Sequence, residues 1–227
     1  MPARTPTLVA MSIGILLVIG LGILVSIGAA DAIDHAIIRQ VRGPDSALLG
    51  FLRPVTELGS TGAVTIVAAI VLVVGIAIGR WRYGALGAAI IGLASIGVEL
   101  VKLLVARTRP EILEPLIDEH GFAFPSGHAT LSMTAYGVLA VLVGRSRLPV
   151  AAKVAMEVGA AVVIGLVGLS RVWLGVHHPS DVLAGWIAGA VIVLAYAELT
   201  RGASTGPAAA AADGDRGVPR SDPPAAG

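Results

Sequence analysis

Long apolar runs alternate with short polar turns along the first 200 residues. Six of the runs reach or approach the roughly 20 residues that an α-helix needs to cross a bilayer. They are 8–30, 60–79, 85–106, 126–144, 150–169 and 180–199. The pattern therefore predicts an all-α integral membrane protein with six transmembrane helices in one bundle.

The first run and the segment after it need separate interpretation. Ala30-Asp31-Ala32 resembles the cleavage site of a signal peptide, but the run is longer than the roughly 7–15 residues of a signal-peptide core, so we expect an uncleaved span. Residues 31–59 carry charges throughout and two prolines, which predicts short helices at the membrane interface. Residues 1–200 would form one membrane domain, and residues 201–227, rich in Ala, Gly and Pro, a disordered cytoplasmic tail.

Composition agrees with a membrane protein. The chain has 227 residues, of which 56% are hydrophobic and 14% charged, against roughly 45–50% and 25% in soluble domains. The formal net charge of +1 indicates no nucleic-acid partner. The chain contains no cysteine, which excludes disulfides and thiolate metal sites.

Basic residues in the loops predict the orientation. Lys and Arg divide evenly between the two sides, but the turns 80–84 and 145–149 carry only basic charges, whereas the opposite loops mix basic and acidic residues. We therefore place these two turns and both termini in the cytoplasm. Three other polar segments, at the end of the third span, the start of the fourth and between the fifth and sixth, then meet on the extracytoplasmic side.

The first polar segment runs from Lys102 through Arg107 and Arg109 to Pro110. A lysine inside a span is energetically costly and usually functional, although its amine could instead extend to the headgroups beside Glu99. Pro110 ends the helix and leaves the Arg109 guanidinium at the surface. The acidic residues of the following loop are expected to face solvent. They are Glu111, Glu114, Asp118 and Glu119.

The second polar segment is Phe124-Pro125-Ser126-Gly127-His128, directly before an apolar run. Ser126 is a natural N-cap, and Gly127 would let a ligand approach the backbone. Free N–H groups and the positive end of the helix dipole suit a phosphate there. A plain N-cap followed by an interfacial histidine is the alternative reading.

The third polar segment, 170–181, contains Arg171, His177, His178 and Asp181. Arg171 supplies a forked cation for phosphate oxygens. The Asp181 carboxylate, four residues after His177, can accept the Nδ1–H of that imidazole and leave Nε2 free as nucleophile or base. His178 is expected to point elsewhere. Several cations in the same cluster argue against a metal site.

Taken in order, Lys102-x6-Arg109-Pro110, Pro125-Ser126-Gly127-His128 and Ser170-Arg171-x5-His177-x3-Asp181 resemble the three-part signature of the PAP2 (type 2 phosphatidic acid phosphatase) superfamily. That family shares its phosphate pocket with bacterial acid phosphatases and vanadium haloperoxidases. Each motif alone is modest, but the three together are specific. Arg107 and His178 stand at variable positions of the signature, so the resemblance adds nothing to them.

The resemblance implies a PAP2/acid-phosphatase-like core and a phosphate site without a metal or other cofactor. Lys102, Arg109 and Arg171 would neutralise the phosphate dianion and the charge that grows in the transition state. The hydroxyl of Ser126 and the amide of Gly127 would donate hydrogen bonds to the phosphate oxygens.

The resemblance also implies the catalytic roles. His177 would attack phosphorus to form a phosphohistidine, and Asp181 would orient it and stabilise its charge. His128 would protonate the leaving oxygen and then activate water to release phosphate. Partners would be membrane lipids and a lipid phosphate substrate, such as phosphatidic acid, a phosphatidylglycerol phosphate or an isoprenyl pyrophosphate.

Three other functions compete with this interpretation. A lipid phosphotransferase would use the same intermediate and another acceptor. A vanadate-dependent haloperoxidase is disfavoured because those relatives are soluble. A transporter that binds anions without chemistry is disfavoured because its polar residues should lie near the bilayer midplane, whereas here they gather at one rim.

Overall fold

The computed structural model describes residues 5–41, 46–111 and 114–201. Within these ranges the secondary structure is helical, as predicted, and no strand occurs. The helices are α1 (Thr5–Ser26), α2 (Asp31–Val41), α3 (Ser46–Glu57), α4 (Thr61–Ala77), α5 (Trp81–Val105), α6 (Gly127–Gly144), α7 (Val150–Trp173) and α8 (Pro179–Leu199). The predicted disordered tail, apart from Arg201, lies outside the described residues.

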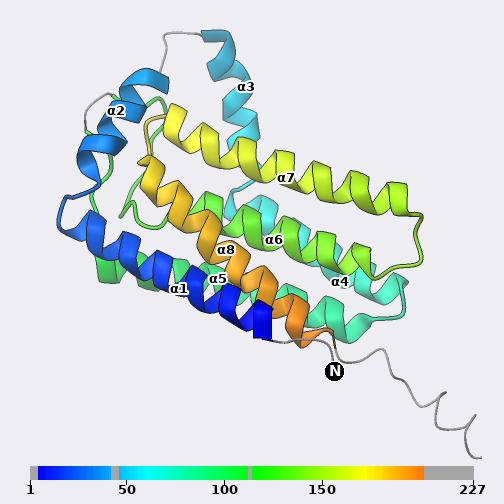
Figure 1. Ribbon diagram of the computed structural model, residues 1–227. Helices are drawn as coiled ribbons and strands as arrows, with labels where there is room; N and C mark the ends of the chain where they lie inside the picture. The colour runs from blue at the N-terminus through cyan, green and yellow to red at the C-terminus, as the bar shows by residue number, and fades with distance from the viewer. Residues whose placement is uncertain (1–4, 42–45, 112–113, 202–227) are drawn as a thin grey trace, which may run out of the picture.

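The long helices lie side by side in one bundle, and α2 and α3 sit at one end of it (Figure 1). Helix α6 is central, because it packs against α4, α5, α7 and α8, while α1 packs along α8. Helix α3 contacts α7, and α2 contacts both α7 and α8. We call the end that carries α2 and α3 the α3 end. The described chain starts and finishes at the opposite end (Figure 1).

Five helices, α1, α5, α6, α7 and α8, are long and apolar enough to cross a membrane. Helix α4 has 17 residues, about 26 Å at 1.5 Å per residue, against a hydrocarbon core of ~30 Å. Helices α3 and α4 are bent by 50° at the break between them and make a sixth span only if the bent pair counts as one. The protein is a multi-pass helical bundle. Five of the six predicted spans are helices long and apolar enough to cross a membrane, and the count of six stays a prediction.

Several predicted boundaries shift by a few residues. Ser60 caps α4 as expected, since its hydroxyl accepts the N–H of Ala63 at 3.3 Å. The basic-aromatic turn is shorter than predicted: Gly79, with φ +72°, ends α4, and Trp81 already begins α5. The described parts of the 31–59 segment form the short helices α2 and α3, as predicted. Their place at the interface stays a prediction, as does an uncleaved first span.

Two glycines let α8 lie against α6. A Cβ on Gly189 would stand 2.6 Å from Cβ of Met133 and 2.8 Å from the carbonyl oxygen of Thr130. A Cβ on Gly185 would stand 2.8 Å from the carbonyl oxygen of Ser126. This Gly-xxx-Gly spacing permits the backbone approach that packs helices in lipid. It also joins the first turns of both helices, where the N–H of Ser126 donates to the carbonyl of Asp181 at 3.0 Å.

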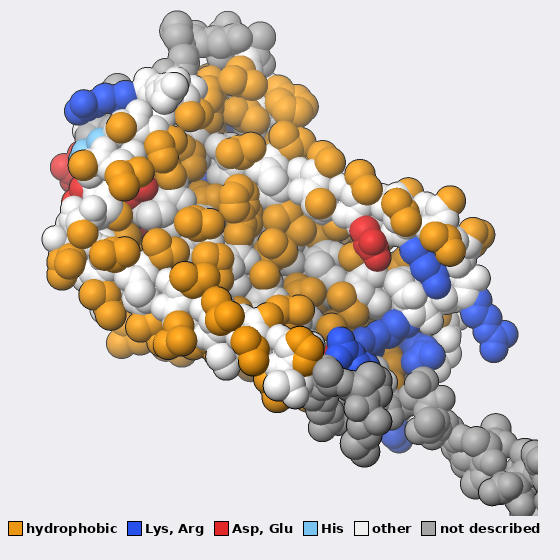
Figure 2. Space-filling model, in the orientation of Figure 1, with side chains coloured by type: hydrophobic (Ala, Val, Ile, Leu, Met, Phe, Trp, Pro, Cys, Tyr) orange, Lys and Arg blue, Asp and Glu red, His pale blue; other side chains and the backbone are white. Residues whose placement is uncertain are grey.

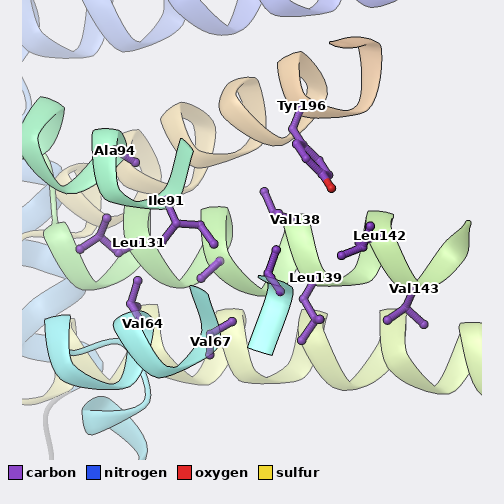
Figure 3. Close-up of a cluster of buried hydrophobic side chains, with 12 residues drawn as sticks. Val64, Val67, Ile91, Ala94, Leu131, Val138, Leu139, Leu142, Val143 and Tyr196 are labelled. Atoms are coloured by element: carbon purple, nitrogen blue, oxygen red, sulfur yellow. The ribbon is translucent and has the colours of Figure 1, made fainter. Parts of the chain in front are cut away.

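Apolar side chains fill the interior between the helices (Figure 3). The cluster includes Val64 of α4, Ile91 of α5, Leu131 and Val138 of α6 and Tyr196 of α8. The ring of Tyr196 is buried, and its hydroxyl donates to the carbonyl of Tyr83 at 3.2 Å. The apolar side chains of this cluster agree with the argument against a transporter.

We expect Gly189→Leu to lower the thermal unfolding midpoint of the protein in detergent. Even a Cβ at this position meets Met133 and the α6 backbone, and overpacking of this kind destabilises by about 1–3 kcal/mol. Gly92→Leu on α5 is the matched control, because nothing lies within 4 Å of a Cβ there. Equal midpoints for the two variants would contradict the packing role of Gly189.

Candidate active site

A cavity of about 700 Å³ opens at the α3 end, between α3, α5, α6, α7 and the loop that precedes α6. Its wall contains six of the eight residues singled out from the sequence. They are Lys102, Arg109, Gly127, His128, Arg171 and His177. The other two, Ser126 and Asp181, are buried and do not line the cavity. The three polar segments, far apart in the chain, therefore meet at one place.

Lys102 comes from the last turn of α5 and reaches the start of α6. A Cβ on Gly127 would lie 3.6 Å from the Lys102 Nζ, so the amine stands beside the N-terminus of α6. The same Nζ donates to Oε1 of Glu99 at 2.8 Å, and the Glu99 side chain is mostly exposed. Lys102 therefore pairs with Glu99 on the helix surface and also lines the cavity, and its role in phosphate binding stays a prediction.

Arg171 and Arg109 share one carboxylate, that of Glu119. Nη2 of Arg171 donates to Oε1 of Glu119, and Nη2 of Arg109 donates to Oε2 of Glu119 at 3.2 Å. Nη1 of Arg171 donates to the hydroxyl of Thr56 on α3 at 2.9 Å, and Nη1 of Arg109 to the carbonyl of Val176 at 2.8 Å. Both guanidiniums are thus fixed at the cavity wall.

The prediction that Glu119 faces solvent is wrong. Its side chain is 25% exposed, because the buried guanidinium of Arg171 and the largely buried one of Arg109 need a counter-charge. Burial opposes its ionisation, but the charges of Arg171 and Arg109 outweigh burial and hold the pKa of Glu119 below its ordinary value. The other three acidic residues of this loop are exposed, as predicted. They are Glu111, Glu114 and Asp118.

His177 lies between Asp181 and Arg109. Its Nδ1 is 3.6 Å from Oδ2 of Asp181, beyond hydrogen-bond range, and has no hydrogen-bond partner among the described residues. The expected Nδ1–H bond to Asp181 is therefore not formed. Nε2 lies 3.4 Å from Nη1 of Arg109. Burial lowers the pKa of His177 to about 4, and nearby Asp181 offsets this only in part, so the imidazole is neutral at pH 7.

The carboxylate of Asp181 turns to the start of its own helix instead. Its Oδ2 accepts the backbone N–H of His178 at 2.9 Å, which closes a capping box at the N-terminus of α8. The His178 ring lies 6.0 Å from the His35 ring, centroid to centroid, and does not line the cavity. His178 therefore lies away from the cavity, as expected, but its Nδ1 is 3.3 Å from Oδ2 of Asp181, the carboxylate that was expected to serve His177.

His128 and Ser126 lie at the start of α6. The His128 side chain lines the cavity and packs on Gly59, where a Cβ would stand 3.2 Å from Cβ of His128. Ser126 occupies the N-cap position as predicted, but its hydroxyl makes no capping bond. Its Oγ is buried without a partner in the described part of the chain. Buried hydroxyls are normally hydrogen-bonded, so this one retains an unused donor next to the cavity wall residues Gly127 and His128.

Arg107, given no role from the sequence, pairs with three carboxylates next to the cavity. Its Nη1 donates to Oδ1 of Asp181 and to the hydroxyl of Ser180, both at 2.7 Å. Its Nη2 donates to Oδ1 of Asp31 at 2.9 Å and to Oδ2 of Asp34 at 2.8 Å. The guanidinium therefore joins the end of α5, the start of α2 and the start of α8.

Asp34 completes this network. Its carboxylate accepts the backbone N–H of Ser180 at 3.0 Å and the Ser180 hydroxyl at 2.6 Å. Burial lowers the pKa of Arg107, but the carboxylates around it outweigh burial, and the net pKa lies above its ordinary value. The spacing of Asp31, Asp34 and Ile38 on one face of α2 was the sequence signal for a buried contact, but it did not identify the partner.

No three His, Asp or Glu side chains in the described ranges are grouped so that they could hold a metal ion. Whether the reaction needs a metal is not decided by this, and metal independence stays a prediction.

Comparison with known families explains the cluster of signature residues. The model of the PAP2 superfamily matches residues 82–202, more than half of the 227 residues. The chain belongs to the PAP2 superfamily. The matched region begins in the first turn of α5 and includes all eight predicted site residues, whereas α2 and α3 precede it.

Individual relatives are phosphatases by name. Phosphatidylglycerophosphatase B of Bacillus subtilis is 38% identical over 96 residues, 41% of this chain and 46% of the relative. Undecaprenyl-diphosphatase of Sulfolobus acidocaldarius is 32% identical over 116 residues, 48% of this chain and 50% of the relative. The chain thus spans about half the length of the curated relatives it matches.

A solved structure resembles the whole bundle. The crystal structure of a transmembrane PAP2 type phosphatidylglycerolphosphate phosphatase from Bacillus subtilis matches with a TM-score of 0.77 and 27% sequence identity. The match covers 84% of this chain and 96% of that one. It supports the multi-pass membrane architecture and the PAP2 fold.

We expect Arg107→Ala to lower the thermal unfolding midpoint in detergent by several degrees. The substitution leaves Asp34 and Asp181 buried without their cation, and loss of one partner of a buried ion pair costs about 3–5 kcal/mol. Arg39→Ala is the control, because Arg39 is an exposed cation on α2. A midpoint for Arg107→Ala equal to that of the control would refute the anchoring role.

Proposed function

We propose that this PAP2 protein is a membrane lipid phosphatase that hydrolyses a phosphomonoester or diphosphate at the end of a lipid. The observation that carries the proposal is the cavity at the α3 end. Three cations, Lys102, Arg109 and Arg171, and two histidines, His128 and His177, line the same 700 Å³ space. Cations converging on one point suit a phosphate dianion and its transition state.

The names of the relatives indicate the substrate class. By name, they act on phosphatidylglycerophosphate, on undecaprenyl diphosphate and, in Mycobacterium tuberculosis, on decaprenylphosphoryl-5-phosphoribose. These share a terminal phosphate on a membrane-bound hydrocarbon. The proposed substrates are phosphatidic acid, a phosphatidylglycerol phosphate or an isoprenyl pyrophosphate. The cavity lies at the ends of the spans, so the phosphate enters at headgroup depth.

The first chemical step is proposed at Nε2 of His177. The neutral imidazole attacks phosphorus, the bond between phosphorus and the lipid oxygen breaks, and His128 donates a proton to that oxygen. The products are a phosphohistidine and the free lipid alcohol or lipid monophosphate. Arg109, with Nη1 already 3.4 Å from Nε2 of His177, stabilises the charge on the transferred phosphoryl group.

The second step returns the enzyme to its starting state. Water attacks the phosphohistidine, His128 takes the proton from that water, and phosphate leaves from Nε2 of His177. Asp181 balances the positive charge of the imidazole in both steps, from 3.6 Å. The orphaned hydroxyl of Ser126 and the first amides of α6 are proposed as donors to phosphate oxygens.

We also propose that the cavity faces the extracytoplasmic side. The turns whose only charges are basic lie at the opposite end of the bundle, together with the first and last described residues (Figure 1). Basic turns favour the cytoplasm, which places the α3 end outside.

We expect His177→Ala and His128→Ala each to reduce phosphate release from lipid phosphates by at least about 10²-fold. Only His177→Ala should also fail to form a trapped phosphoenzyme, because it lacks the nucleophile. His120→Ala, in the exposed part of the loop, is the matched control and should retain activity. Retained turnover in His177→Ala would remove the proposed nucleophile.

Assays contain EDTA, and activity lost to EDTA and restored by Mg²⁺ would contradict the metal-free mechanism.

The Glu119 carboxylate pairs with Arg109 and Arg171, the two arginines proposed to bind the substrate phosphate. In the proposed cycle, the substrate phosphate displaces the Glu119 carboxylate from these arginines. After hydrolysis, the carboxylate competes with the phosphate product for the same two arginines. We expect Glu119→Gln to strengthen inhibition by inorganic phosphate about tenfold, since the competing charge is gone. Asp118→Asn is the control, because Asp118 borders the same cavity but is exposed. Unchanged or weaker inhibition in Glu119→Gln would exclude the competition.

A further inference from the structure

A second cavity, of about 870 Å³, lies at the end of the bundle away from the candidate active site. It forms between the turn that joins α4 to α5 and the turn that joins α6 to α7. Four arginines line it, namely Arg80, Arg82, Arg145 and Arg147. Figure 2 shows Lys and Arg side chains gathered at this end of the molecule. We call this space the arginine cavity.

Among the described residues, no carboxylate balances the charge of the arginine cavity. No Asp or Glu lines it. Within the described ranges, none of its four arginines forms an ion pair, and neighbouring Glu198 pairs with Arg201 at 2.7 Å. Like charges around one concave surface raise the local potential and attract an anion.

Arg145 is built into the wall of this cavity. Its Nη2 donates to the carbonyl of Ala197 on α8 at 2.8 Å, and its guanidinium lies 5.8 Å from the centre of the Tyr83 ring. Arg80 lies 5.4 Å from the centre of the same ring. The ring therefore holds two guanidiniums at the cavity before any ligand binds, through cation–π contacts.

One nitrogen of Arg145 is available to a ligand. Nη1 is buried and has no hydrogen-bond partner among the described residues, although buried donors nearly always have an acceptor. Burial lowers the pKa of Arg145 below its ordinary value, and the charges of Arg80 and Arg201 act in the same direction. A bound anion would relieve both effects and satisfy the free donor.

The preference of basic loops for the cytoplasm explains why some of these arginines are present, but not all of them. It accounts for exposed arginines such as Arg82 and Arg147, because basic loops favour the cytoplasm. It does not account for Arg145, which is half-buried between Tyr83 and the α8 backbone.

The rim of the arginine cavity is apolar. Trp81 is 58% exposed and Leu148 is 49% exposed, and both lie next to the ends of spans, at headgroup depth. An indole at that depth is typical of a membrane interface. Arginines below an apolar rim fit a molecule with a charged head and hydrocarbon tails better than a free anion.

We propose that the arginine cavity binds the phosphate headgroup of an anionic glycerophospholipid from the leaflet opposite the candidate active site. The headgroup phosphate accepts hydrogen bonds from Arg80 and Arg145, and the acyl chains contact Trp81 and Leu148. The site is independent of the proposed reaction, because none of these residues lines the candidate active site.

Native mass spectrometry of the full chain, released from micelles with equal amounts of phosphatidylglycerol and phosphatidylcholine, tests this site. We expect phosphatidylglycerol to be retained in preference. Arg80→Gln and Arg145→Gln should each weaken its binding about fivefold, as expected for one arginine near a lipid phosphate. Arg39→Gln removes the same charge from an exposed position on α2 and should leave binding unchanged.

Three results would overturn the proposal: equal retention of the two lipids, an equal loss in Arg39→Gln, or displacement of phosphatidylglycerol by an equal concentration of inorganic phosphate. Thermal midpoints in neutral micelles separate lost binding from lost folding. If Arg145→Gln unfolds, Arg80→Gln decides the question, because the Arg80 side chain stacks on the Tyr83 ring and forms no ion pair with a described residue.

Discussion

The buried guanidinium of Arg107 is the constraint on which the α3 end of the structure depends. It reaches Asp31 and Asp34 of α2 and Asp181 of α8, so one cation holds together segments about 75 and 150 positions apart. Buried carboxylates are tolerated only when they are paired and hydrogen-bonded. The start of α8, and with it the loop that carries His177, therefore cannot move independently of α2.

The candidate active site contains charged side chains, whereas the bundle interior next to it is apolar. Below it, the interior of the bundle is apolar and closely packed (Figure 3), and polar groups would be costly there. At the rim, Arg109 and Arg171 are held by Glu119, while Asp181 is held by Arg107 behind the wall. Each buried charge has a nearby opposite charge, and the groups that face the cavity are those that a phosphate could engage.

The arginines at the two ends of the bundle have different kinds of partner. At the α3 end, Arg107, Arg109 and Arg171 are all paired with carboxylates. At the opposite end, Arg80 and Arg145 are held by an aromatic ring and a backbone carbonyl, neither of which neutralises them. At the α3 end, carboxylates balance the positive charge of the arginines. At the opposite end, no described carboxylate pairs with Arg80 or Arg145. This difference supports separate roles for the two cavities.

Much of the candidate site could be predicted from the sequence because its chemistry is local. Lys102, Ser126 and His177 each stand at the end of an apolar run, and alternation of spans places such ends on one side. Glu119 and Arg107 could not be placed in this way. One lies in an irregular loop, the other stands at a variable position, and the partners of both are distant in the chain.

The amino-acid sequence by itself determined the helical membrane class, five of the spans and the meeting of three polar segments, because apolar run length and helix-ending residues act over short distances. Only the tertiary structure decided that α3 and α4 bend, that the Asp181 carboxylate caps the N-terminus of α8 and lies 3.6 Å from Nδ1 of His177, and that Glu119 pairs with the arginines. These features follow from the balance of buried charges, and that balance depends on which distant residues the packed helices bring together.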